Sequence, residues 1–195
     1  MARPIEFDYD KVLESAMQQF WKDGYEASSV QKLLDVTGIN RGTLYNSFGD
    51  KDTFFRMCVE RYNDRIKKQI DASLGNAKLE SVKAIEAYCK AVLIEPAPKQ
   101  RNFGCLLVNS VCESINWNKE QQKLIRSSLN AVRRAFLSRT RQLEKARKLR
   151  RGLNADTAAE VLMNLLQGLY VSARNGRTTG QLQSLLDNGI LAILK

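Results

Sequence analysis

Residues 28–48 have the sequence SSVQKLLDVTGINRGTLYNSF, which predicts two short helices joined by a tight turn. Ser28 and Gln31 have the spacing of a capping box, so we expect the first helix to begin at Ser28. Gly38 lies just past its end, where glycine tolerates the positive φ that stops a helix. Asn40 is then in position to cap the second helix.

The second helix has two different faces. Leu44 and Phe48 lie four residues apart and therefore point to the same, inner side. The opposite side carries side chains that bond phosphates or base edges, and a glycine that lets the backbone approach closely: Arg41, Gly42, Thr43, Tyr45 and Asn46. This is the arrangement of a helix-turn-helix with a recognition helix, and it predicts a sequence-specific DNA-binding protein.

Individual contacts can be assigned to several of these side chains. Arg41 is the best candidate for reading a base, because arginine pairs bidentately with guanine. Asn46 suits adenine or a phosphate. Ser28 and Ser29 offer hydroxyls and a helix N-terminus to a phosphate. For Asn46 and Ser28 the alternative, an ordinary surface or capping residue, is equally open.

The run Gly42-Thr43-Leu44-Tyr45-x-x-Phe48-x-x-Lys51 belongs to a longer pattern. Its other members are Phe7, Asp8, Ala16, Phe20, Gly24, Tyr25, Val30, Gly38, Ile39, Phe54 and Phe55. On this pattern, about the first third of the chain resembles the DNA-binding domain of the TetR family of bacterial one-component repressors. The resemblance implies that Thr43 and Tyr45 contact phosphates and bases and that Lys51 contacts a phosphate. Residues 104–109 (GCLLVN) are also similar to a segment found in many members.

The resemblance also implies an architecture. It predicts an all-α protein of about nine helices, in which a three-helix helix-turn-helix domain (residues 1–50) is joined by a long helix to a C-terminal ligand-binding and dimerisation domain (residues 51–195). It places the homodimer contact on the last two helices, whose alternative role is to bury their apolar residues in their own core. On a palindromic operator, two recognition helices would lie roughly 34–36 Å apart, or a multiple of that. The implied function is a repressor that an unknown small-molecule effector or a thiol modification releases from DNA.

Helical periodicity extends the all-α prediction along the chain. Besides the two helices above, we expect helices at residues 9–23, 51–72, 79–94, 105–115, 119–150, 155–174 and 179–194. Residues 95–104, EPAPKQRNFG, are the clearest loop.

The net charge of +10 does not support DNA binding by itself, because of where it lies. Residues 119–151 carry twelve basic and two acidic residues, and the rest of the chain is balanced. DNA affinity should therefore come from a few well-placed cations: Arg3, Arg41, Lys51, and Lys22 or Lys32. We expect the basic segment to be a solvated helix face opposite a buried stripe. The functional alternatives are a site for an anionic ligand and a surface for an acidic partner.

Cys105 is the sharpest candidate outside the helix-turn-helix. It is expected in the first turn of a helix, where the dipole would stabilise a thiolate able to sense oxidants or electrophiles. The alternative is a small apolar residue in a packed turn. Cys112 lies two turns on, roughly 10.5 Å away, which exceeds the ~7 Å reach of a disulfide.

A ligand pocket is expected among the helices between residues 51 and 174. Its candidate lining residues are Tyr62, Tyr88, Phe103, Asn109, Trp117 and Phe136. Aromatic residues at helical spacing also occur as plain core, and that alternative stays open.

Composition limits the other classes of function. The chain has no His, no Gly-rich phosphate loop and no metal-spaced cluster, so we expect neither an enzyme nor a cofactor. The chain has no run of eighteen apolar residues and no apolar leader. We therefore expect a cytoplasmic protein without membrane contact. The four cysteines form no C-x-x-C pair, which agrees with reduced thiols in the cytosol. The remaining alternative is a helical scaffold or partner-binding protein without specific DNA binding.

Overall fold

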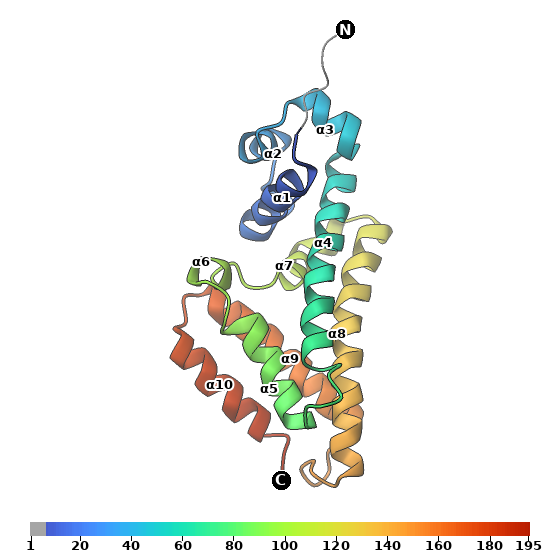
Figure 1. Cartoon of the computed structure of the whole chain (residues 1–195), viewed down its shortest axis with the longest axis vertical. Helices are drawn as coiled ribbons and strands as arrows, with labels where there is room; N and C mark the ends of the chain where they lie inside the picture. Colours follow the sequence, from blue (N-terminus) through green and yellow to red (C-terminus); the bar gives the residue numbers. More distant parts are fainter. Residues whose placement is uncertain (1–6) are drawn as a thin grey trace.

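The computed structural model describes residues 7–195, and the regular secondary structure of that part is helical (Figure 1). It contains ten α-helices and one short 3-10 helix: α1 (Tyr9–Asp23), α2 (Val30–Thr37), α3 (Arg41–Phe48), α4 (Lys51–Ala72), α5 (Ser81–Leu93), α6 (Pro98–Arg101), α7 (Leu106–Glu113), η1 (Ser114–Asn116), α8 (Lys119–Lys145), α9 (Ala155–Arg174) and α10 (Thr179–Leu191). The predicted all-α architecture is confirmed. Within residues 7–195, none of the helices combines the length and the apolar character that crossing a membrane requires.

Most helix starts are encoded locally. In seven helices the side chain of the residue before the first turn accepts a hydrogen bond from a backbone N–H of that turn, which satisfies a group that the helix itself leaves unpaired. These capping residues are Asp8, Ser29, Asn40, Asp50, Asn118, Asn154 and Thr178. Gly38 ends α2 in the left-handed conformation, with φ 70°.

Several predicted boundaries were wrong; the helix expected over 79–94, for example, begins at Ser81. The helix expected from Ser28 begins two residues later, after the Ser29 cap. The expected loop 95–104 contains the single turn α6, which has a proline at its start. The helix expected over 119–150 ends at Lys145, because Arg147 adopts a positive φ of 54°. Beyond it, Leu149 forms an isolated bridge with Leu194 near the C-terminus. The same bridge ends α10 at Leu191.

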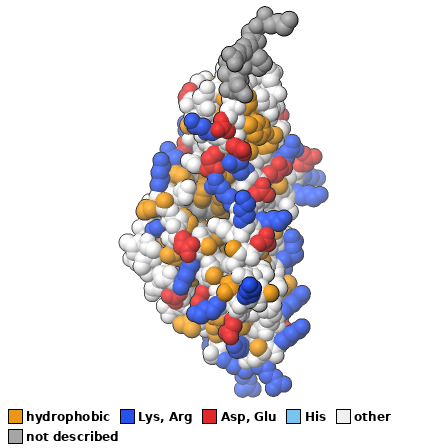
Figure 2. Space-filling model, in the orientation of Figure 1, with side chains coloured by type: hydrophobic (Ala, Val, Ile, Leu, Met, Phe, Trp, Pro, Cys, Tyr) orange, Lys and Arg blue, Asp and Glu red, His pale blue; other side chains and the backbone are white. Residues whose placement is uncertain are grey.

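The molecule is elongated (Figure 1). Helices α1–α3, which we call the head, lie at one end, and α4 runs from the head into the body beside α8. In the body, α9 packs against α8, and α10 packs against α9 and α5. Basic side chains gather at the end opposite the head (Figure 2). One continuous apolar core runs through the head and the body.

Candidate DNA-binding site

Two buried side chains hold α3 in the head. Leu44 and Phe48 are 0% and 1% exposed, as the spacing predicts. The Phe48 ring stacks on Tyr9, with 5.0 Å between centroids, and lies 4.4 Å from the ring of Phe54. Because these rings belong to α1 and to the start of α4, α3 is fixed to both helices.

The opposite face of α3 is open to solvent. Arg41, Gly42, Tyr45 and Asn46 are exposed, and Thr43 is half-buried. A Cβ added to Gly42 would meet only the Asn40 carboxamide oxygen, so this stretch of backbone is free to approach a ligand closely. The structure thus brings all five predicted residues of this helix to one end of the molecule.

Lys51 lies in the first turn of α4, next to α3. Its Nζ is 4.2 Å from the centre of the Tyr25 ring, a cation–π contact. The Tyr25 hydroxyl donates a hydrogen bond to Asp52. Partial burial lowers the pKa of Lys51, whereas burial and the Asp52 carboxylate raise the pKa of Tyr25. The ammonium is thus held against an aromatic face, next to the start of α4.

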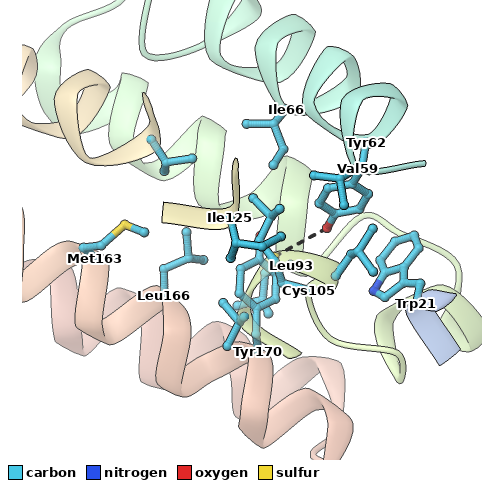
Figure 3. Packing of buried hydrophobic residues seen from close by; sticks show 14 of the residues in the cluster. Trp21, Val59, Tyr62, Ile66, Leu93, Cys105, Ile125, Met163, Leu166 and Tyr170 are labelled. Carbon is cyan, nitrogen blue, oxygen red and sulfur yellow. Dashed lines mark hydrogen bonds between the residues drawn. The ribbon is translucent and has the colours of Figure 1, made fainter. Parts of the chain in front are cut away.

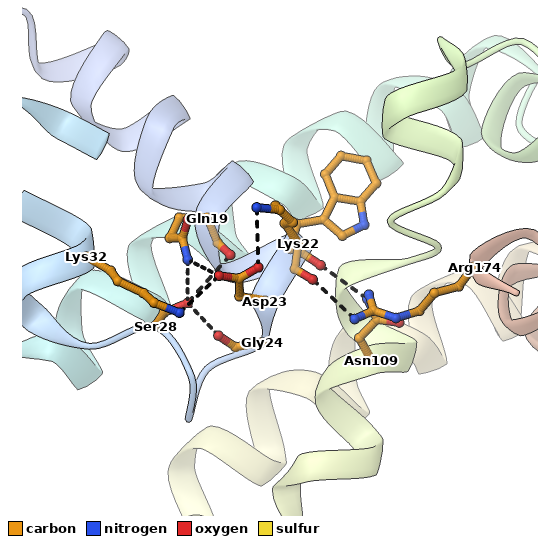
Figure 4. A network of polar contacts seen from close by, with 9 residues as sticks. Gln19, Lys22, Asp23, Gly24, Ser28, Lys32, Asn109 and Arg174 are labelled. Carbon is orange, nitrogen blue, oxygen red and sulfur yellow. Dashed lines mark hydrogen bonds and ion pairs between the residues drawn. The ribbon is translucent and has the colours of Figure 1, made fainter. Parts of the chain in front are cut away.

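The two adjacent serines have different roles. Ser29 is exposed and accepts the Lys32 N–H at 3.2 Å, so it caps α2. Ser28 is 0% exposed, and its hydroxyl donates to the Gly24 carbonyl at 2.6 Å (Figure 4). The prediction that Ser28 contacts a phosphate was wrong, because this hydroxyl faces the interior.

The other predicted cations are less available. Lys32 forms an ion pair with Asp23 at 3.3 Å, and Lys22 lies 3.7 Å from the same carboxylate (Figure 4). Arg3 lies outside the described residues. Arg41 and Lys51 are therefore the best-placed cations of the described part.

Cys105 does not have the environment predicted for a sensor thiol. It caps α7 but is 4% exposed, and the Tyr62 hydroxyl donates to its sulfur at 3.5 Å (Figure 3). Burial raises the pKa of Cys105 above its usual value, although N–H groups of α7 act to lower it. The burial favours the alternative of a packed, apolar thiol, because desolvation opposes the effect of the helix end.

The six candidate pocket residues are mostly core. Tyr88 and Phe136 are fully buried and pack edge to face, and Tyr62 covers Cys105. Trp117 packs against Tyr25 and Phe55 at the junction of head and body. One member of the set, Phe103, lines a surface hollow beside α1.

Asn109 has a structural role instead, together with two residues that the sequence did not single out. The Asn109 side chain donates to the Trp21 carbonyl at 3.3 Å, and Arg174 of α9 donates to the Lys22 carbonyl at 3.1 Å (Figure 4). The Glu113 carboxylate accepts the N–H of Tyr25 at 2.9 Å. Three body side chains therefore hold the end of α1, and no pattern in the sequence distinguishes Glu113 or Arg174.

Gly24 makes this close contact possible. Its φ is 87°, and a side chain there would overlap the Glu113 carboxylate. A glycine at the end of α1 is thus required both by the backbone conformation and by the neighbouring helix α7.

Residues 12–58, which cover most of the head and the start of α4, match the family model described as "Bacterial regulatory proteins, tetR family". The chain is also 31% identical over 188 residues to the HTH-type transcriptional repressor ComR of Escherichia coli (strain K12), an alignment that covers 94% of this chain and 87% of that protein. The chain belongs to the TetR family. As a TetR-family protein it is a DNA-binding transcriptional regulator and not an enzyme.

Solved structures agree with the TetR fold. A cysteine mutant of the TetR-family regulator CifR, complexed with 26-bp double-strand operator DNA, has a TM-score of 0.85 and 22% identity, with 98% of this chain and 100% of that chain covered. The reduced form of E. coli NemR has a TM-score of 0.79 and 18% identity, with 95% and 96% covered. These likenesses extend beyond the head and include the body helices.

Proposed function

We propose that this regulator is a cytoplasmic repressor that binds a palindromic operator through α3 and the start of α4. The observation that carries the proposal is the open face of α3, which presents Arg41, Thr43 and Tyr45 at one end of the molecule, with Lys51 beside it. In this assignment Arg41 reads a base, while Lys51 and the Ser29 end of α2 bind phosphates. Residues 1–50 would form the DNA-binding domain and residues 51–195 the regulatory and dimerisation domain.

A palindromic operator requires a dimer, and α9 and α10 are the best surface for it. Large apolar side chains are exposed on both helices: Val161, Val171, Leu185 and Leu191. The exposed positions between them include the uncharged Asn164, Gly168 and Ser184 as well as the charged Arg174, Arg177 and Asp187. Such a surface is typical of a protein–protein interface.

Release from DNA would begin in the body. A ligand or modification that shifts α7 or α9 would act on α1 through Glu113, Asn109 and Arg174, and so change the position of the head. The effector is unknown, and the buried Cys105 argues against direct oxidation of that thiol. ComR and CifR are a transcriptional repressor and an operator-bound regulator, respectively, and these relatives support the assignment.

Selection of binding sequences from a random duplex pool tests the proposal. We would use reduced protein at about 150 mM salt, where non-specific phosphate attraction is weakened. An enriched palindrome should bind the unmodified protein and should fail to bind Tyr45→Ala or Lys51→Ala. Lys123→Ala, which removes an exposed lysine of α8, is the matched control and should still bind. If an intact dimer enriches no sequence, the proposal is wrong and the scaffold alternative gains support.

A further inference from the structure

The positive charge of the chain is concentrated at the end of the molecule farthest from α3. The basic tip, as we call it, comprises the exposed cations Arg141, Lys145, Arg147, Lys148, Arg150 and Arg151. They lie in the last turns of α8 and in the loop that follows it, opposite the head (Figures 1 and 2). Because the basic tip and α3 lie at opposite ends of the molecule, the tip cannot contact the duplex that α3 binds.

These charges are not neutralised within the molecule. In residues 7–195, no side chain of the basic tip lies within ion-pair distance of a carboxylate, whereas Arg133 on the same helix pairs with Glu160 and Asp156. The nearest acidic residue in sequence, Glu144, accepts the N–H of Ala155 at 3.0 Å and so caps another helix. Within the described residues, the cations of the basic tip are therefore not paired with carboxylates.

The loop that carries the cations is held in place. Arg150 N–H donates to the Ile193 carbonyl at 2.9 Å, Lys195 N–H donates to the Lys148 carbonyl at 3.1 Å, and Leu149 is 5% exposed. Arg147 has the only positive φ of a non-glycine residue in the described part of the chain. A glycine would adopt this conformation at lower energetic cost. The arginine at this position therefore strains the backbone locally and places a cation on the surface.

A hollow continues the tip along α8. It has a volume of about 580 Å³ and is lined by Arg134, Arg141 and Lys145 together with uncharged side chains, and no carboxylate lines it. Arg134 and Lys145 are eleven residues apart, about 16 Å along the helix. Double-stranded DNA presents one charge per ~1.7 Å of its axis, so this length matches about ten phosphate charges.

The surroundings favour a nucleic acid over an acidic protein. A protein interface needs an apolar centre. No large apolar side chain of residues 141–151 is exposed, and on the C-terminal segment beside them Leu191 is a single exposed apolar residue. Phosphates need only cations with free donors, which arginine and lysine supply. We propose that the basic tip binds the sugar–phosphate backbone of a second DNA duplex, without sequence preference, while α3 holds the operator.

This inference goes beyond the proposed function and can be tested independently of it. We would measure binding of a fluorescent duplex of random sequence by anisotropy at about 50 and 150 mM salt, where phosphate contacts dominate. The full chain would carry Tyr45→Ala and Lys51→Ala, which disable the predicted operator contacts. The tip variant adds three further substitutions: Arg141→Gln, Lys145→Gln and Lys148→Gln.

The matched control removes three exposed cations from the other end of α8: Lys119→Gln, Lys123→Gln and Arg126→Gln. We expect the tip variant to lose about tenfold in affinity and its salt slope to fall by about 0.9 for each lost contact, with little change in the control. Equal losses in the two variants would show a diffuse effect of net charge and overturn the proposal, as would unchanged binding of the tip variant. Thermal melting by circular dichroism verifies that both variants fold.

A second readout separates the tip from the head. Protein with an intact head is loaded on a surface-tethered operator, found by selection, and then exposed to a labelled non-operator duplex. The unmodified tip should capture the second duplex, and the tip variant should load equally on the operator without capturing it. Capture by both proteins would contradict the proposal, whereas failure to load would contradict the proposed function instead.

Discussion

Ser28 and Ser29 are neighbours of the same chemical type, yet their surroundings give them unrelated roles. The Ser28 hydroxyl is enclosed between α1 and α2, where it donates to the Gly24 carbonyl and also accepts from the Gln19 side chain at 3.4 Å. Ser29 is one residue farther on and faces solvent at the N-terminus of α2. At this scale, one residue of register decides whether a hydroxyl is available to DNA.

The serine pair yields a prediction. Ser28→Ala should lower the free energy of unfolding by about 1 kcal/mol through a lost buried hydrogen bond, and should leave operator affinity unchanged. Ser29→Ala should cost a similar ~1 kcal/mol as a lost cap, and should also weaken operator binding. Chemical denaturation and anisotropy titration measure the two effects. If a fully folded Ser28→Ala variant lost operator affinity, the structural role assigned to Ser28 would be wrong.

The cysteines differ in the same way, and their reactivity should follow. Cys105 is buried with a raised pKa, whereas Cys112 is exposed on α7. Because the thiolate is the reactive form, iodoacetamide should label Cys112 first and Cys105 at least about tenfold more slowly in the folded protein. Intact-mass spectrometry follows the labelling, and Cys112→Ser should abolish the fast phase. A fast phase that depends on Cys105 would restore the sensor hypothesis.

At the scale of helices, α1 is held by charged side chains of α4. The Glu14 carboxylate accepts from Arg61 at 3.2 Å and also from Arg65. Burial acts to raise the pKa of Glu14, but hydrogen bonds from Gln18, Arg65 and Arg61 outweigh it and leave the pKa below its usual 4.5. The ion pairs join the head to α4, the helix that connects it to the body.

This lowered pKa has a definite sign for stability. The ionised carboxylate stabilises the fold above its unfolded pKa, and that stability is lost as the pH falls through the lower folded value. Glu14→Gln should therefore be less stable than the unmodified protein by about 0.5–1 kcal/mol near neutral pH. The difference should disappear at low pH, as denaturation across a pH series would measure. A difference that stays constant with pH would show that the charge is not responsible.

Glu113 gives a second prediction at this scale. Its carboxylate accepts the N–H groups of Tyr25 and of Glu26, at 2.9 and 3.2 Å. Glu113→Ala should lower stability by about 1–2 kcal/mol, because a partly buried donor loses its acceptor. Hydrogen exchange should become faster at residues 25–26 and stay unchanged in Glu60→Ala, an exposed glutamate on α4. Unchanged exchange in Glu113→Ala would exclude this contact as a link between body and head.

At the scale of the whole molecule, the exposed apolar residues of α9 and α10 and the open face of α3 should act together. Leu185→Asp and Val171→Asp place a charge at positions that are 44% and 56% exposed in the single chain. We expect both to dissociate the homodimer, because a dimer would bury these charges without partners. Operator affinity should fall as a consequence.

Sedimentation velocity measures the association state. Val36→Asp is the matched control, because Val36 is also 44% exposed but lies on α2 in the head. It should remain dimeric. If Leu185→Asp and Val171→Asp also remain dimeric, the homodimer contact lies on another surface.

The amino-acid sequence by itself determined the helix-turn-helix and the all-α class. The information is local: Asn40 caps α3, Gly38 ends α2, and the four-residue spacing of Leu44 and Phe48 separates a buried face from an open one. Such features act within one or two helical turns, so they can be predicted without knowledge of the fold.

Only the tertiary structure decided which polar groups are available. Ser28 is inaccessible because its hydroxyl turns inward between α1 and α2, and Cys105 is inaccessible because helices distant in sequence, among them α4 with Tyr62, cover it. Glu113 and Arg174 hold α1 across 88 and 152 residues of chain. The charge of residues 119–151 is visible in the sequence, but the place of the basic tip opposite α3 follows from the direction in which α8 packs along α4. Solvent access and position within the molecule arise from contacts between distant segments, which a local pattern does not contain.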